Sequence, residues 1–179
     1  FRNDLITTGA VLEIAASETP VTETYTTNSG FDWKGKDPDM EEEFVTIGVT
    51  HDFGKAIGWQ IKEGNDFSKD LASDSSGFII NEAAANYMGF KNPIGEVMKW
   101  GKNGEWKVIG VVNDMVTQSP YSAVKPMIFF LKSSRLNFIR LNIINIKLDP
   151  SVSATEALEK IEPIFKKYDP ANAFEYKFS

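Results

Sequence analysis

The chain has 179 residues, of which 42% are hydrophobic and 25% are charged, as in ordinary globular proteins. Its 19 basic and 25 acidic side chains give a net charge of −6, which argues against a broad basic surface for nucleic acid or anionic lipid. Cysteine is absent, so disulfides and thiolate metal sites are excluded. A chain of this length can form one domain or two small subdomains around a real core.

No part of the sequence is apolar enough to span a bilayer, because no stretch approaches ~18 consecutive apolar residues. The chain starts with Phe1 rather than Met, and its first residues lack the basic-then-apolar layout of a signal peptide. We therefore expect the chain to be a piece of a larger protein.

The first elements are predicted to be a helix, a strand and a long connection. Leu5 to Ala16 has a loose apolar face and is followed by Pro20, which predicts a helix. Val21 to Thr27 is rich in β-branched residues and predicts a strand. Residues 28–43 are polar and rich in turn formers, and within them Trp33 is expected to anchor packing.

The connection also carries an acidic run between residues 37 and 43. Its carboxylates are those of Asp37, Asp39, Glu41, Glu42 and Glu43. Calcium takes several oxygen ligands, so a cation site is one interpretation. The run lacks the central glycine and distal glutamate of an EF-hand loop. A solvated acidic loop is the preferred interpretation, and the sequence leaves cation binding open.

A strand–helix–strand unit is expected next. Phe44 to Val49 predicts a strand, after which Thr50 caps a short helix that Gly58 ends. Trp59 to Lys62 predicts another strand. His51 is the only histidine, and without cysteine or a second histidine it offers neither a zinc site nor a catalytic triad.

The stretch from Gly77 to Asp114 organises the chain. It begins with an apolar strand over residues 78–80 that runs into a helix. Asn81 is a good N-cap residue, and Glu82 lies at the positive end of the helix dipole. Gly89 fits the left-handed position that ends a helix.

A turn and a hairpin complete this stretch. Asn92-Pro93-Ile94-Gly95 is typical of a turn, and strands are expected over Glu96–Trp100 and Trp106–Val112. Gly101 to Gly104 joins them as the hairpin turn. The spacing between Gly95 and Gly101 and the flanking strands exclude a phosphate-binding P-loop.

The last third is predicted to form a βαβ-type or split-βαβ connection. Pro126 introduces a strand over Met127–Leu131, and an alternating run from Phe138 to Leu148 predicts a long strand. The second half of that run is apolar on both faces, which indicates burial between layers. A closing strand is expected over Phe174–Phe178.

The helix between these two strands has the clearest pattern. Ser153 and Glu156 are spaced as a capping box, and apolar residues then repeat every three or four positions. Pro163 is expected to kink the helix, because it removes a backbone hydrogen bond.

The ordered series "IINEAAANYMGFKNPIGE…W…VIGVVND" resembles the extracytoplasmic domain of MacB/FtsX-like ABC transporter permeases. Shorter pieces around Trp33, Phe67 and Pro126 fit the same pattern. Two places depart from it: Asn113-Asp114-Met115 stands where a Lys-Asp-Phe-like triplet is usual, and Asn65 replaces a commoner Arg. The residues that match the family's structural motif are Trp33, Gly35, Gly64, Phe67, Asn81, Glu82, Asn92, Pro93, Gly95, Gly110, Val111, Asp114 and Pro126.

The resemblance implies an α+β fold with two subdomains. A discontinuous, porter-like subdomain with βαβ-type connections would comprise residues 1–63 and 135–179. A smaller, inserted, mixed α/β subdomain would comprise residues 64–134. Both chain ends would face the membrane, where transmembrane helices outside this sequence would anchor the domain.

The implied function is mechanical. A cytoplasmic ATPase subunit or domain would move the transmembrane helices, and the periplasmic domain would relay that motion to an exported peptide, lipid or drug or to a partner protein. The parent protein would be dimeric. The alternative is a free-standing periplasmic ligand-binding protein. We expect no catalysis, cofactor, metal site or nucleic-acid partner, because no nucleophile elbow exists and the paired carboxylates lie only in the acidic loop.

Overall fold

The structure is a computed structural model that describes residues 1–20, 26–115, 123–132, 136 and 140–178, and it has the predicted α+β class. Its α-helices are α1 (Arg2–Thr7), α2 (Phe53–Ile57), α3 (Glu82–Tyr87) and α4 (Ala154–Tyr168), with 3₁₀ turns at Ala72–Ser76 and Gly101–Asn103. Its strands are β1 (Val11–Ser17), β2 (Thr27–Asn28), β3 (Phe31–Trp33), β4 (Phe44–Val49), β5 (Ile61–Gly64), β6 (Gly77–Asn81), β7 (Val97–Trp100), β8 (Glu105–Val112), β9 (Met127–Leu131) and β10 (Ile143–Leu148). Among the described residues, no helix combines the length and the apolar character needed to cross a bilayer.

These strands form one mixed sheet. The strand order is β10-β1-β4-β9-β6-β8-β7-β3, with β2 paired to β4 and β5 paired to β8. The pairs β4–β9 and β6–β8 are parallel, and the other pairs are antiparallel. Parallel pairing brings the carboxyl ends of β6 and β8 to the same edge, where Asn81 lies opposite Val112.

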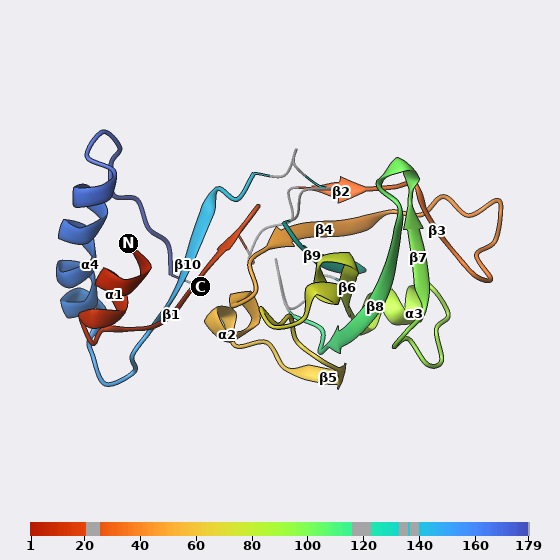
Figure 1. Cartoon of the computed structure of the whole chain (residues 1–179), viewed down its shortest axis with the longest axis horizontal. Helices are drawn as coiled ribbons and strands as arrows, with labels where there is room; N and C mark the ends of the chain where they lie inside the picture. Colours follow the sequence, from red (N-terminus) through yellow and green to blue (C-terminus); the bar gives the residue numbers. More distant parts are fainter. Residues whose placement is uncertain (21–25, 116–122, 133–135, 137–139, 179) are drawn as a thin grey trace.

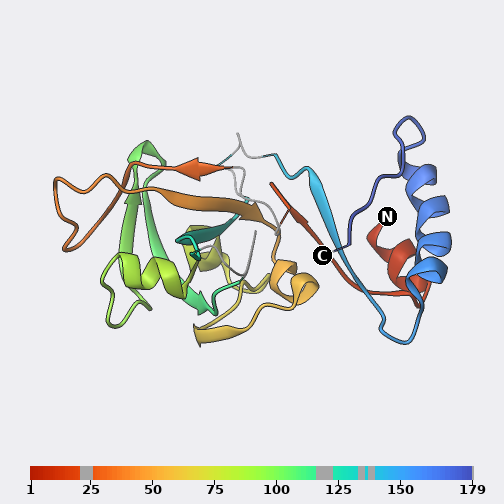
Figure 2. The same cartoon turned by 180° about the vertical axis from the view of Figure 1, so that it is seen from behind.

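The molecule is elongated, and elements from both ends of the chain share one end of it (Figure 1). We call α1, β1, β10 and α4 the terminal lobe, and the remaining elements the strand-rich lobe; the reverse view shows the same separation (Figure 2). The β1–β4 ladder between the lobes is narrow, since its register consists of Ser17 opposite Val49. The division of the chain at 63/64 and 134/135 remains a prediction.

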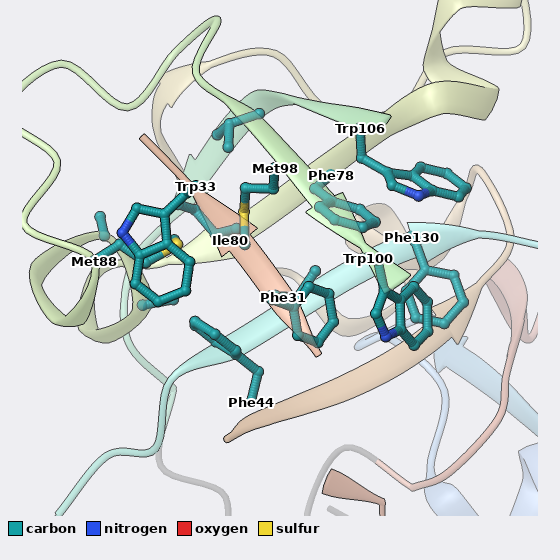
Figure 3. Packing of buried hydrophobic residues seen from close by; sticks show 14 of the residues in the cluster. Phe31, Trp33, Phe44, Phe78, Ile80, Met88, Met98, Trp100, Trp106 and Phe130 are labelled. Carbon is teal, nitrogen blue, oxygen red and sulfur yellow. The ribbon is translucent and has the colours of Figure 1, made fainter. Parts of the chain in front are cut away.

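An aromatic core fills one face of the sheet in the strand-rich lobe (Figure 3). Phe31 stacks on Trp100 with ring centroids 5.0 Å apart, and Phe78 stacks on Trp106 at 4.8 Å. Rings this close contribute about 0.5–1.5 kcal/mol per pair beyond the area they bury. Trp33 is buried in the same cluster, which confirms it as a packing anchor. The buried Nε1 of Trp106 has no hydrogen-bond partner among the described residues.

The opposite face of the sheet packs against α2. Ile79 and Phe129 point to this side, whereas their neighbours Phe78 and Phe130 belong to the aromatic core. Strands β4, β6 and β9 are therefore buried on both faces, which explains their continuous apolar sequences.

The local signals of the central stretch are confirmed. The Asn81 side chain accepts a hydrogen bond from Ala84 N at 3.0 Å, as an N-cap should, and α3 follows directly. Gly58 and Gly89 both adopt positive φ, 74° and 71°, after α2 and α3. The expected strands β4, β6, β7, β8 and β9 are all present.

The predicted helix over Leu5–Ala16 is wrong. Helix α1 ends at Thr7, Gly9 turns the chain with φ 71°, and β1 begins at Val11. The apolar spacing here fits either element, and antiparallel pairing with β10 decides for a strand.

Thr50 does not cap α2. Asp52 holds the N-cap position without a side-chain hydrogen bond, and Thr50 Oγ1 instead accepts from Ala16 N at 3.0 Å. The connection over 28–43 is also more structured than expected, since it contains β3. The predictions for residues 21–25 and 138–139 lie outside the described residues.

Two predictions for the last third are wrong as well. Strand β10 lies at the edge of the sheet, and Ile144 is 47% exposed, so this strand is not buried between layers. Residues 174–178 form no strand, and the predicted βαβ-type connection around α4 is therefore missing from the described part of the chain. Ser153 does cap α4, accepting from Glu156 N at 3.2 Å, but Glu156 bonds Lys160 rather than completing the capping box.

Candidate functional site

The buried side chain of Asn81 connects three segments at one edge of the sheet. Its Oδ1 accepts from Ala84 N at 3.0 Å and from Met127 N at 2.8 Å, and its Nδ2 donates to Lys125 O at 2.9 Å. The residue is fully buried. One amide therefore caps α3 and also fixes the start of β9, a segment more than forty positions away in the sequence.

Glu82 and Asp114 extend this network at the ends of β6 and β8. Asp114 Oδ1 accepts from Ala83 N at 2.9 Å, and Glu82 Oε2 accepts from Asp114 N at 3.3 Å. Lys62 on β5 forms an ion pair with the other oxygen of Glu82. We call Lys62, Asn81, Glu82 and Asp114 the polar hub.

The charged groups of the hub stabilise each other's ionised forms. The hydrogen bond from Lys62, with a smaller contribution from Asp114 N–H, lowers the pKa of Glu82 below its usual value. The same contact raises the pKa of Lys62. Glu82 therefore stays ionised to lower pH, and Lys62 to higher pH, than the isolated side chains would.

A glycine seam lies beside the hub, where the end of β5 meets β8. A Cβ on Gly64 would lie 2.2 Å from Ile109 O and 2.7 Å from the Cδ1 of Ile94. A Cβ on Gly110 would lie 2.3 Å from Asn65 O. Only glycine allows both backbones to approach this closely. Ile94 belongs to the predicted turn, so the motif glycines let that turn pack on β5.

The turn itself is held to β8. Gly95 N donates to Val108 O at 2.8 Å, and Glu96 N donates to Pro93 O at 3.1 Å. Pro93 is buried whereas Asn92 is exposed. Val111 is buried in the aromatic core.

The remaining motif residues lie on neighbouring strands. Pro126 O accepts from Val45 N at 2.9 Å, which joins the segment before β9 to β4. Phe67 packs on the α2 side of the sheet, next to Trp59. Most motif residues therefore gather around the carboxyl half of β8 and its neighbours.

Trp33 and Gly35 lie apart from the hub, at the β3 end of the sheet. We call the contacts of Glu42 with Gly30, Phe31 and Lys36 in this region the brace. Glu42 accepts from Gly30 N at 2.7 Å and Phe31 N at 2.8 Å and forms an ion pair with Lys36. Burial opposes the charge of Glu42, but these three donors hold its pKa below the usual value. Glu42 is thus a buried structural carboxylate, and the interpretation of the whole acidic run as solvated is wrong at this residue.

Cation binding by the acidic run gains no support from its geometry. Within the described residues, no group of three or more His, Asp or Glu side chains is arranged to hold a metal ion. His51 lies beside α2 and forms no hydrogen bond or ion pair with a described residue.

Sequence reasoning did not identify Lys62, Glu42 or Asp66 as structural partners. Asp66 accepts from Trp59 Nε1 at 3.0 Å, and Gly54 leaves room for this pair because a Cβ there would lie 1.9 Å from Nε1. Burial raises the pKa of Asp66 above its usual value. The one sequence feature that distinguishes Glu42 from the other carboxylates of the run is its position two residues before the buried strand β4.

Comparison with protein families gives a match over residues 3–164 to the model described as MacB-like periplasmic core domain. Comparison with curated protein sequences gives no match.

Several solved structures have the same fold. The periplasmic region of MacB from Actinobacillus actinomycetemcomitans matches with a TM-score of 0.63 at 19% identity, over 94% of this chain and 73% of that one. The extracellular domain of the noncanonic ABC-type transporter YknZ from Gram-positive bacteria matches with a TM-score of 0.63 at 14% identity, over 95% and 82%. A domain of a putative permease from Porphyromonas gingivalis matches with a TM-score of 0.57 at 18% identity, over 88% and 70%.

Proposed function

The chain belongs to the family of MacB-like periplasmic core domains of ABC transporter permeases, and on that premise we propose that it relays motion across the periplasmic face of a transporter. A cytoplasmic ATPase would drive transmembrane helices attached to the two ends of the chain. The domain would pass their motion to an exported molecule or to a partner protein. The domain boundaries at 63/64 and 134/135, the dimeric parent and the membrane anchoring are parts of this proposal.

The observation that carries the proposal is the contact between α1 and α4, the first and the last helix of the described chain. Asp4 on α1 accepts from Lys167 Nζ at 2.8 Å and from Tyr168 Oη at 3.2 Å on α4, and the Phe1 and Tyr168 rings meet edge to face at 5.5 Å. Helices entering at both ends would thus act on one lobe (Figure 1). A well-packed lobe can then move as a rigid body.

The motif residues support this mechanical role. The hub fixes four segments with satisfied hydrogen bonds, and the glycine seam locks β5 to β8 at close contact. Such connections stiffen the strand-rich lobe, which a lever needs.

The first test is the topology of the full-length product. The proposal predicts that the protein stays in membranes extracted with alkaline carbonate and that protease added to intact spheroplasts cleaves this domain. A protein that washes off or is found in the soluble periplasmic fraction would contradict it and favour the free-standing binding protein.

The second test measures whether the lobes move as one body. The chain has no cysteine, so spin labels can be placed at Ser151→Cys in the terminal lobe and Lys102→Cys in the strand-rich lobe without background from this domain. A relay predicts one narrow distance distribution in the nucleotide-free and the ATP-trapped transporter. A control pair within the strand-rich lobe, Lys102→Cys with Lys91→Cys, should also stay constant. A change in the first pair alone, on adding substrate without ATP, would indicate closure around a ligand instead.

A further inference from the structure

An open pocket of about 420 Å³ lies where the two lobes meet. Its walls come from β1 and β10 of the terminal lobe and from the β4–α2 turn and Lys69 of the strand-rich lobe. The volume is within the range of about 300–1,000 Å³ that is typical of small-molecule sites. A molecule bound here would contact both lobes.

The wall of this pocket is almost entirely apolar. Ile14, Ala15 and Ala16 of β1 and Ile144 of β10 line it. Ile144 is 47% exposed, so much of its side chain is open to a bound molecule. Covering these atoms would gain roughly 25 cal/mol for each Å² of apolar surface removed from water.

Two cations, Arg2 and Lys69, and one carboxylate, Asp52, line the pocket, and Glu13 beside it also pairs with Arg2. Arg2 and Lys69 both form ion pairs with the carboxylate of Asp52. The distance from the Arg2 nitrogen to the Asp52 oxygen is 3.8 Å. Asp52 is 15% exposed, whereas Arg2 is 43% and Lys69 is 60% exposed. The cations therefore present their free N–H groups to solvent, and the carboxylate is largely covered.

Both cations also have donors to spare. Arg2 uses two nitrogens, for Glu13 Oε1 at 2.5 Å and Ile14 O at 3.3 Å, and a guanidinium has five N–H groups. An ammonium has three, and Lys69 directs one to Asp52. The His51 side chain lines the same pocket without a hydrogen bond to any described residue. An incoming anion can accept from these groups without displacing Asp52.

We propose that this pocket binds a small anionic amphiphile, with its apolar body against Ala16 and Ile144 and its anionic group at Arg2 and Lys69. The arrangement of an apolar wall with a few convergent polar groups is that of a ligand site. The proposal stands on these contacts and holds whether or not the domain relays motion.

The test compares three probes that share a decyl chain: sodium decanoate, decyltrimethylammonium bromide and decyl maltoside. Each is titrated below its micelle concentration into the ¹⁵N-labelled 179-residue chain. Decanoate should bind at least tenfold more tightly than the cation, with amide shifts confined to residues 14–16, 50–52, 69 and 144. Equal binding of the three probes, or shifts spread over the whole surface, would show non-specific partition and overturn the proposal, as would the absence of binding.

Variants separate the apolar wall from the charged rim. Ala16→Leu fills the pocket and should abolish decanoate binding, whereas Ala154→Leu, on the exposed start of α4, should not change it. Lys69→Gln should weaken decanoate on the order of threefold to tenfold and leave decyl maltoside unchanged.

Ile144→Glu keeps the test decisive if Ala16→Leu does not fold. This substitution places an anion on the wall at an exposed position, so it should expel decanoate but not the cationic probe. Retention of decanoate by Ile144→Glu would overturn the proposal. Binding of decanoate to a soluble domain that fails the membrane topology test would leave this site standing and remove only the relay.

Discussion

Replacing Asn81 by alanine tests the claim that one buried amide connects three segments. The substitution removes the N-cap of α3, which costs about 1 kcal/mol. It also leaves Met127 N, which is buried, without its partner, and an unsatisfied buried group costs about 1–3 kcal/mol. Lys125 is exposed, so water can replace the bond that its carbonyl loses. We expect the free energy of unfolding to fall by about 2–4 kcal/mol.

Two further variants assign this loss to its parts. Asn81→Asp keeps the acceptor for Ala84 N and Met127 N but loses the donor to Lys125 O, so it should cost less than Asn81→Ala. Asn86→Ala removes the same side chain from the exposed side of α3, and it should change stability by less than about 0.5 kcal/mol.

Urea unfolding monitored by tryptophan fluorescence gives these free energies, provided that the slope with denaturant is the same for all variants. A loss of about 1 kcal/mol for Asn81→Ala would equal a helix cap alone. That result would refute the argument that the amide also holds the start of β9.

Three other substitutions test the seam, the brace and the Trp59 pair. Gly64→Ala should lower the free energy of unfolding more than Gly35→Ala does. Both glycines have positive φ, which costs alanine about 1–2 kcal/mol, but only a Cβ on Gly64 would also meet backbone atoms. Urea unfolding of the two variants measures the difference. The lowered pKa of Glu42 stabilises the fold above the unfolded-state pKa and loses that effect as pH falls, so Glu42→Gln should flatten the decline of stability between about pH 5 and 3. The raised pKa of Asp66 has the opposite sign: stability should fall as pH rises from the unfolded-state value of 3.8 through the folded one, and Asp66→Asn should remove that fall. A pH profile unchanged by either substitution would contradict the corresponding assignment.

The sequence predicts those parts of the fold that short-range signals control. Asn81 and Gly89 delimit α3 through local hydrogen bonding and φ, and the neighbouring strands follow from their apolar runs. The predicted helix over Leu5–Ala16 is wrong from residue 11 onward, because the apolar spacing there fits both periods. The strand conformation of residues 11–17 depends on β10, more than 120 positions away, and no local pattern reports that partner.

The candidate site shows the same limit. The motif residues could be named from their resemblance to a family, but Lys62 could not, because its pairing with Glu82 depends on β5 lying across β8 from β6. The sequence predicts a solvated run that includes Glu42, because nothing local distinguishes it from its neighbouring carboxylates as the one that accepts from Gly30 N and Phe31 N. Residues 174–178 alternate like a strand but form none, because alternation does not by itself supply a neighbouring strand.

The antiparallel pairing of β1 with β10 determines how the domain responds to force. Val11, at the start of β1, lies opposite Leu148, at the end of β10, so both chain ends leave the ladder at the same side. Pulling those ends apart would break the backbone hydrogen bonds of the ladder sequentially, starting at Val11 and Leu148, because each bond bears the load in turn. Moving both ends together puts no load on the ladder. The β1–β10 ladder should therefore resist concerted motion of the two ends and separate when the ends are pulled apart.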